Sequence, residues 1–219
     1  MECIEKKRYV RIGLFGVSRS GKNYTIDDFM DIARSEGVEF IHLSPMDMIR
    51  SRLGDTRLKD MSKEAKKSLV KEVRKEIDVF SEAHNIVVDE HFCYPESFGG
   101  MKLENGYYDE KLPHDILRSP EYRVGYEVVF PRFESMKYDL LAVLNIDPGI
   151  IVERCRTSEG TKYNPYITED EVAEWERVEI DGLKLESSVP IVQIEDPRKS
   201  GSILWDSVKP IMGRSKHSF

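Results

Sequence analysis

Residues 9–25 of the chain read YVRIGLFGVSRSGKNYT, an apolar run that passes through glycines into a lysine. Its apolar positions before residue 16 are typical of a buried strand, and those from 26 to 33 fall on one helical face. Gly16, Gly21 and Lys22 match the core of a phosphate-binding loop, G-x-x-x-x-G-K. Where that motif has Ser or Thr, this chain has Asn23. The stretch therefore predicts a loop for nucleotide phosphates and leaves its metal-binding role open.

The chemistry of such a loop explains its residue types. Glycines let successive backbone N–H groups approach an anion, and the start of a helix adds its positive end. A lysine adds a mobile charge that reaches the outer phosphates. The predicted phosphate-binding residues are Gly16, Val17, Ser18, Arg19, Ser20, Gly21, Lys22, Asn23 and Tyr24. The alternative is an ordinary strand–helix turn with a solvated lysine.

Composition limits the class of protein. With 219 residues, of which 40% are hydrophobic and 33% charged, we expect one globular domain spanning 1–219. The formal net charge of −7 argues against nonspecific nucleic-acid binding. No apolar run has the length of a membrane span, and none follows the charged start as a signal peptide requires. Cys3, Cys93 and Cys155 form no CxxC pair, which favours a reducing compartment, so we expect a cytoplasmic protein without a zinc site.

Strand and helix patterns alternate along the chain, which predicts an α/β fold with a parallel sheet between helices. Strands are expected at about 9–15, 39–43, 86–89, 138–146 and 189–194. Helices are expected at about 22–36, 45–53 and 62–80, from 150, and at 168–185 and 203–212.

Residues 92–135 interrupt this alternation with glycines, prolines and several tyrosines. We expect an insertion or mobile arm over the edge of the sheet. Its aromatic rings could stack on a base, or they could pack the arm onto the body of the protein.

An acidic residue ends one of the predicted strands. In NIVVDEHF the buried run stops at Asp89, and His91 follows. Because ligands lie at the carboxyl ends of strands in open parallel sheets, Asp89 is a candidate magnesium ligand together with Asn23. Asp89 could instead cap a helix or pair with a cation. His91 is a candidate substrate contact, with a structural hydrogen bond as the alternative.

Several cations follow the fourth predicted strand. Arg154, Arg156 and Lys162 lie in IIVERCRTSEGTKY, and Arg177 lies on the next predicted helix. Guanidinium groups suit phosphoryl transfer because they bridge the oxygens over which negative charge spreads. We therefore predict catalytic roles for Lys22, Arg154, Arg156 and Lys162. For Arg177 we predict substrate binding. The alternative is surface arginines paired with neighbouring acids.

A further basic group follows the second predicted strand. Arg50, Arg52 and Arg57 are placed to meet an acceptor phosphate. Nearby aspartates could instead neutralise these arginines.

In the order and spacing of its motifs, the chain resembles the nucleoside monophosphate kinases, and most closely the archaeal-type adenylate kinases. The phosphate loop comes first, and the lysine-rich helix KDMSKEAKKSLVKEVRKEI precedes NIVVDEHF, where the family has an Asp with a His two places on. GIIVERCRTSEGTKY is similar to the opening of the family's lid, with Arg154 at the lid arginine and Lys162 where a second arginine is expected. PIVQIED is similar to the family's last strand.

The resemblance implies a three-layer P-loop NTPase fold, with a five-stranded parallel sheet flanked by helices, a small lid over about 154–168 and the irregular insertion. It also implies magnesium-dependent transfer of the γ-phosphoryl group of ATP to a nucleoside monophosphate. The expected partner is thus a small nucleotide, not nucleic acid or a membrane.

Three departures leave alternatives open: Asn23, Lys162 in place of an arginine, and the long insertion. One alternative is a P-loop kinase for a deoxynucleotide or a non-nucleotide acceptor. Others are a nucleotide-binding protein without turnover and a slow ATPase switch.

Overall fold

The structure is a computed structural model that describes residues 9–54, 61–95, 97–98, 101–104, 107–111, 126–128, 136–157 and 167–214. Its centre is a five-stranded parallel sheet with the order β10-β9-β1-β3-β2. The strands are β1 (Arg11–Phe15), β2 (Ile41–Leu43), β3 (Ile86–Asp89), β9 (Leu140–Leu144) and β10 (Ile191–Ile194). The expected α/β fold with a five-stranded parallel sheet is therefore confirmed.

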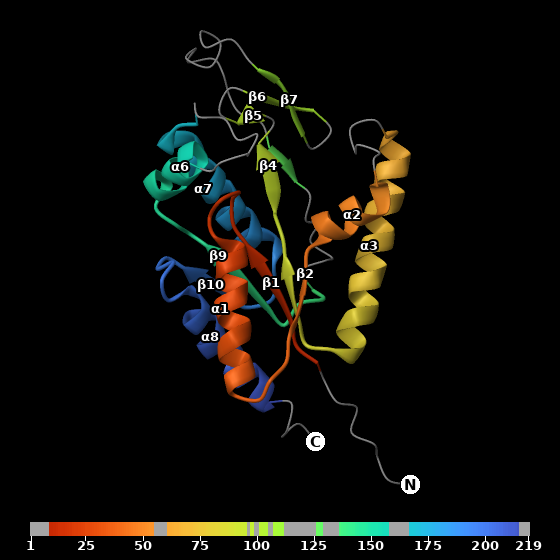
Figure 1. Ribbon diagram of the computed structural model, residues 1–219, viewed down its shortest axis with the longest axis vertical. Helices are drawn as coiled ribbons and strands as arrows, with labels where there is room; N and C mark the ends of the chain where they lie inside the picture. The colour runs from red at the N-terminus through yellow and green to blue at the C-terminus, as the bar shows by residue number, and fades with distance from the viewer. Residues whose placement is uncertain are drawn as a thin grey trace.

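Helices enclose this sheet as outer layers. They are α1 (Lys22–Ser35), α2 (Pro45–Leu53), α3 (Lys63–Ala83), α6 (Pro148–Thr157), α7 (Glu169–Glu186) and α8 (Ser200–Arg214). In Figure 1, α1 and α8 lie together on one side of the strands and α3 lies on the other. The arrangement is the three-layer one that the sequence predicts.

Local signals explain where these helices begin. The side chains of Ser44 and Ser62 accept hydrogen bonds from backbone N–H groups in the first turns of α2 and α3. At the start of α7, Thr168 and Glu171 form a reciprocal capping box, as their spacing predicts. Helix α8 begins at Ser200, three positions before the expected start at 203. There the Ser200 hydroxyl donates to the carbonyl oxygen of Pro197 at 3.0 Å.

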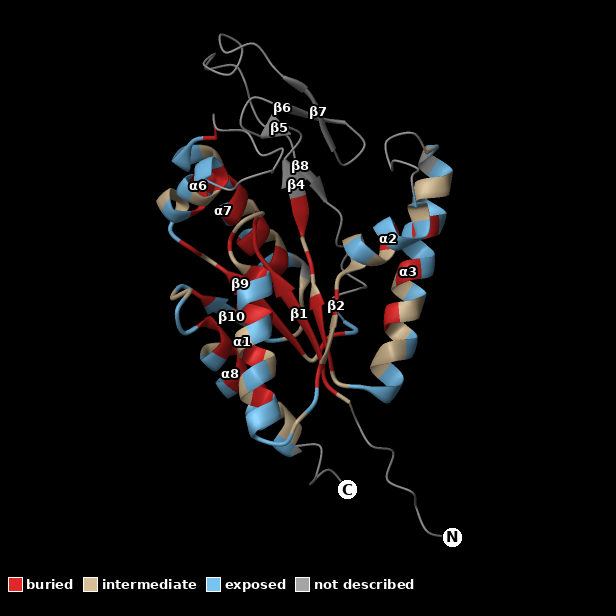
Figure 2. Ribbon diagram, viewed as in Figure 1, coloured by how far each residue is buried: buried red, intermediate tan, exposed pale blue. Residues whose placement is uncertain are grey.

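The core lies between the sheet and these helices. Both β1 and β9 are buried along their whole length, as Figure 2 shows. On α1 the predicted helical face, with Ile26, Phe29 and Ala33, is buried against the rest of the core. Trp175 of α7 is the largest fully buried side chain among the described residues. Burial of this apolar area is the main stabilising term, at about 25 cal/mol per Å².

Part of the predicted insertion is made of short antiparallel strands. β4 (Cys93–Pro95) pairs with β8 (Tyr126–Val128). β5 (Ser97–Phe98), β6 (Met101–Glu104) and β7 (Tyr107–Lys111) form a separate sheet. Apart from Phe92, the rest of 92–135 lies outside the described residues.

Helices α1 and α8 approach closely at Gly201. A Cβ atom at this position would lie 2.7 Å from the backbone nitrogen of Phe29 and against the Asp28 carboxylate. The backbone of α1 could make room for this Cβ atom only if the whole helix moved. Glycine at 201 is therefore a condition for this helix pair.

We expect Gly201→Ala to lower the free energy of unfolding by about 1–3 kcal/mol, the usual cost of overpacking. Urea denaturation measures it. The control is Gly213→Ala in the same helix, where an added Cβ meets nothing within 4 Å. There the better helix propensity of alanine should make the change neutral or stabilising by about 1 kcal/mol. Equal effects of the two substitutions would contradict the close approach.

Candidate active site

The loop between β1 and α1 has a backbone that favours glycine. Gly16 and Gly21 have φ angles of 149° and 104°. A Cβ on Gly16 would lie 2.7 Å from the Ser20 hydroxyl and 3.1 Å from the Leu144 Cβ. Gly21 caps α1 in the left-handed conformation without a side-chain hydrogen bond. No side chain of the cap residue therefore accepts a hydrogen bond from the first N–H groups of α1. Free N–H groups at the start of a helix form an arrangement that binds anions.

Ser20 adds an unusual polar group to this loop. The residue is 1% exposed, and its hydroxyl has no hydrogen-bond partner in the part of the chain that the structure describes. Its backbone N–H donates to the Val17 carbonyl at 3.2 Å, which closes a turn inside the loop. Because a buried hydroxyl without a partner is costly, the site suits a polar ligand.

The Lys22 ammonium is buried beneath the loop. Its Nζ donates to the Gly16 carbonyl oxygen at 2.6 Å and lies 3.1 Å from Nε2 of His91. Oδ1 of Asp89 is 3.6 Å away. Burial lowers the pKa of Lys22, and the charges of Asp89 and Glu179 oppose that shift. The loop is thus tied through this ammonium to the carboxyl end of β3, which makes a solvated lysine the wrong alternative.

Asp89 and His91 end the neighbouring strand. The register pairs Asp89 with Leu14, so its carboxylate lies beside the beginning of the loop. Burial raises the pKa of Asp89, and Lys22 opposes that rise. Burial and the Lys22 charge hold the pKa of His91 well below its ordinary value. A neutral imidazole can accept the Lys22 hydrogen bond through Nε2.

Arg154 on α6 reaches the loop from the other side. Its Nη1 donates to the carbonyl oxygens of Arg19 at 3.0 Å and Ser20 at 2.9 Å. Arg154 therefore supports the loop through its backbone. Arg156, near the end of α6, is exposed, and Lys162 lies outside the described residues, as does most of the predicted lid at 154–168.

The other predicted arginines that the structure describes pair with acidic side chains of helices. Arg50 pairs with Asp47 of its own helix at 3.1 Å, and Arg52 pairs with Glu76 of α3. Arg57 is outside the described residues. Arg177 is 59% exposed and pairs with two acids of its own helix, Glu174 at 2.7 Å and Asp181 at 3.2 Å.

The residues that follow Lys22 point in different directions. Asn23 and Tyr24 are exposed at the beginning of α1. Thr25 is buried, and its hydroxyl donates to the Gly21 carbonyl oxygen at 3.2 Å and to Ser200 Oγ at 2.9 Å. Thr25 therefore supports the helix pair and does not replace the missing hydroxyl at 23.

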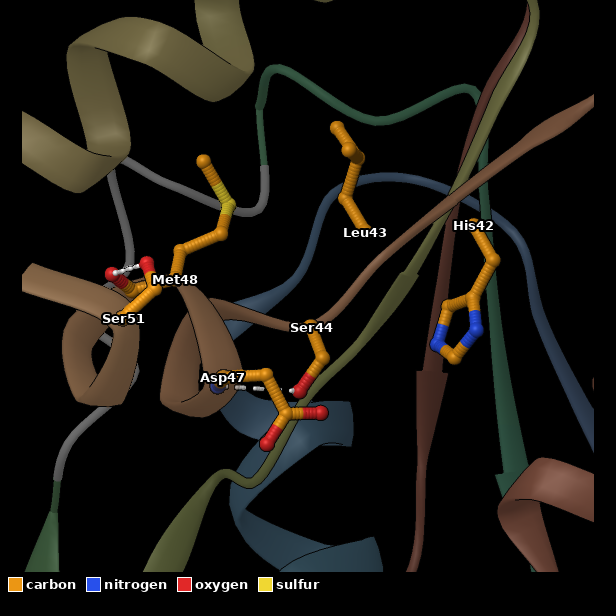
Figure 3. Close-up of a pocket in the computed structure, with 6 residues that line it drawn as sticks. All are labelled: His42, Leu43, Ser44, Asp47, Met48 and Ser51. Atoms are coloured by element: carbon orange, nitrogen blue, oxygen red, sulfur yellow. Dashed lines mark hydrogen bonds between the residues drawn. The ribbon is translucent and has the colours of Figure 1, made fainter.

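An open pocket of about 340 Å³ lies at the carboxyl end of β2. Figure 3 shows its lining residues, among which the Asp47 N–H donates to the Ser44 hydroxyl at 3.3 Å. They are His42, Leu43, Ser44, Asp47, Met48 and Ser51. Because β2 pairs with β3, this pocket lies next to the strand that carries Asp89.

Two buried carboxyl groups of α7 were not predicted from the sequence. Oε1 of Glu179 accepts from the backbone N–H groups of Gly16 at 3.3 Å and Phe92 at 3.1 Å. Oε1 of Glu176 accepts from the Ile146 N–H at 3.1 Å. A signal was present, because Glu179 recurs at helical spacing with the apolar positions of Val172 and Trp175.

Comparisons with known proteins find a likeness among solved structures only. No protein-family model and no curated protein matches the chain. Among solved structures, a shikimate kinase from Bacteroides thetaiotaomicron is similar with 17% identity and a TM-score of 0.49, over 91% of this chain and 98% of that one. The fold assignment above rests on the sheet order and the loop geometry.

Two features are absent from the described part of the chain. None of its helices is both long and apolar enough to cross a membrane. Nor do three or more His, Cys, Asp or Glu side chains gather there as a ready metal-binding group.

The buried carboxyls make stability depend on pH. Burial raises the pKa of Glu176 and of Glu179 from 4.5 to about 7. The folded protein therefore holds these protons more tightly than the unfolded chain. Their stabilisation is complete below pH 4.5 and is lost as the pH rises through 7, by up to about 3 kcal/mol for each carboxyl.

We expect the free energy of unfolding of Glu176→Gln to fall less than that of the wild type between about pH 5 and pH 8. Urea denaturation at four pH values measures both proteins. The difference between them is the relevant quantity, because His91 contributes with the opposite sign. Parallel pH profiles would contradict the raised pKa of Glu176.

Proposed function

We propose that this protein transfers the γ-phosphoryl group of ATP to a small acceptor, with magnesium as its metal. The observation that carries the proposal is the buried Lys22 ammonium, which lies within 3.6 Å of Asp89 at the head of a glycine loop. A lysine that only served solubility would extend into water. A lysine buried among a carbonyl, an imidazole and a carboxylate suits a strongly anionic ligand.

The roles of the chain's residues follow from their positions. The loop amides and the first turn of α1 would bind the phosphates, and Lys22 would meet the outer ones. Arg154 would keep the loop in shape through its two carbonyl contacts. We propose that Arg156 and Lys162 neutralise the transferring group. Exclusion of water would then favour the acceptor over hydrolysis.

The residues present fit a magnesium ion. Oδ1 of Asp89 is buried and has no hydrogen-bond partner within the described ranges. Magnesium is commonly held by one or two carboxylates together with substrate phosphates, so a large cluster of protein ligands is unnecessary. Asp89 would hold the ion, and the Asn23 side chain would hold it through a water molecule. When bound, magnesium would neutralise phosphate charge during the transfer.

A nucleoside monophosphate is our first candidate for the acceptor, in keeping with the adenylate-kinase-like order of motifs. Arg50, Arg52 and Arg57 would then bind its phosphate, and His91 and Arg177 would be further substrate contacts.

The pocket beside β2 supports a second candidate, a non-nucleotide acceptor. Its described lining offers hydroxyls, an imidazole and the Asp47 carboxylate, which suit an acceptor that presents hydroxyl groups.

A panel of acceptors tests this proposal. The purified protein is incubated with ATP, magnesium and one acceptor at a time, and ADP formation is followed. The panel contains nucleoside monophosphates, deoxynucleoside monophosphates and small polyhydroxylated compounds. Acceptor-dependent ADP formation supports a kinase. Tight ATP binding without product from any acceptor would contradict phosphoryl transfer.

We expect Lys22→Ala to lower kcat/KM by about 10²–10³-fold, because a positioned cation for the transferring group is lost. Steady-state kinetics with the best acceptor measures the loss, and circular dichroism checks the fold. The control is Lys199→Ala, because the Lys199 side chain is 74% exposed and lies just before α8. If Lys22→Ala keeps full turnover, the loop has no part in the reaction.

We expect Asn23→Thr to keep turnover and to lower the magnesium concentration at half-maximal rate, because a hydroxyl replaces the amide at the motif position. The reaction rate is measured as a function of magnesium concentration for the wild type and for the variant. A folded Asn23→Thr protein without turnover would mean that the amide has a role of its own.

A further inference from the structure

Glu179 lies completely buried beneath the phosphate loop, with 0% exposure. One oxygen of its carboxyl accepts two backbone hydrogen bonds. The first comes from Gly16, where the loop begins, at 3.3 Å, and the second from Phe92, which follows the acidic end of β3, at 3.1 Å. The donors are 163 and 87 residues away in sequence. A single side chain therefore joins the two backbone segments that carry Lys22 and Asp89.

Packing alone does not explain a glutamate here. An apolar side chain would fill the same volume of the core, whereas burial of a carboxyl group costs free energy unless its hydrogen bonds compensate. The carboxyl hydrogen-bonds to backbone groups whose positions define the site. Its effect is therefore expected on the geometry of the site as well as on stability.

Helix α7 holds the segment after β3 through three further contacts. Trp175 Nε1 donates to the Cys93 carbonyl oxygen at 3.1 Å, and the ring of Trp175 stacks on His91. Gly182, one turn beyond Glu179, lies directly against the ring of Phe92. This segment is thus fixed on α7, and Glu179 extends the same support to the loop.

We propose that Glu179 is a positioning residue for the nucleotide site. It sets the separation between the Gly16 and Phe92 amides, and through them the geometry in which Lys22 and Asp89 meet bound ATP. The ATP part of this inference rests on the proposed function.

Glu176 provides a matched control on the same helix. It is 5% exposed, and its carboxyl oxygen also accepts a backbone hydrogen bond, from Ile146 at 3.1 Å. That donor follows β9 and belongs neither to the loop nor to the segment after β3. Loss of either carboxyl should therefore cost similar stability, and only loss of Glu179 should change the loop.

The experiment compares Glu179→Met, Glu176→Met and Glu179→Gln with the wild type. Methionine has similar length and no acceptor oxygen, whereas glutamine keeps an oxygen for both N–H groups. Two measurements are made, the Kd of ATP by calorimetry and the hydrogen exchange of loop amides in the ligand-free protein.

We expect Glu179→Met to weaken ATP binding about tenfold or more and to speed exchange in the loop by a similar factor, as loss of a buried hydrogen bond predicts. Glu179→Gln should remain within about threefold of the wild type in both, since a neutral hydrogen bond replaces the original one. Glu176→Met should leave both unchanged. If Glu179→Met does not fold, Glu179→Asp withdraws the oxygen by one methylene and takes its place.

Three results would overturn the proposal: equal effects of the two methionine variants, no effect of either, or a Glu179→Gln protein that behaves like Glu179→Met. Failure of the proposed function is distinguishable, because the wild type would then bind no ATP or would bind it without forming product from any acceptor. In that case the hydrogen exchange of the loop amides, which is measured without ATP, still tests the positioning role. Faster loop exchange in Glu179→Met alone would support it, and equal exchange in both methionine variants would overturn it.

Discussion

The buried ammonium of Lys22 is the contact on which the site depends. A cation in the interior requires compensation, and here a carbonyl, an imidazole and a carboxylate surround it. The carbonyl belongs to the loop, and the other two groups belong to the end of β3. The charge therefore requires the loop and the strand end to stay together, which brings a glycine turn and an acid to one edge of the sheet.

Much of the fold could be predicted because its signals are local. The period of the apolar residues gives the strands and the inner face of α1, and Thr168 with Glu171 marks the start of α7. The loop was also predictable from the spacing of Gly16, Gly21 and Lys22, and both glycines have positive φ angles, which glycine adopts at little cost. Even the pairing of Arg177 could have been predicted, since its acidic partners are three and four positions away on the same helix.

The rest of the site could not be predicted, because its partners meet only in the folded chain. The helical spacing of Glu179 with apolar residues indicates a buried position, but nothing in the sequence names Gly16 and Phe92 as its partners. Arg154 was expected to face a phosphate, whereas its guanidinium binds two loop carbonyls from 134 and 135 residues away. Sequence spacing identifies residue types suited to phosphate chemistry, and tertiary contacts decide which of them touch the ligand and which hold the loop.

The hydroxyl pair of Thr25 and Ser200 has a consequence for how the molecule can move. It fastens the first turn of α1 to the first turn of α8, directly behind the loop, from a sequence distance of 175 residues. This hydrogen bond adds to the packing between the two helices and favours their movement as one unit. A rearrangement of the anion-binding end on ligand entry would then fall mainly on the other side of the loop.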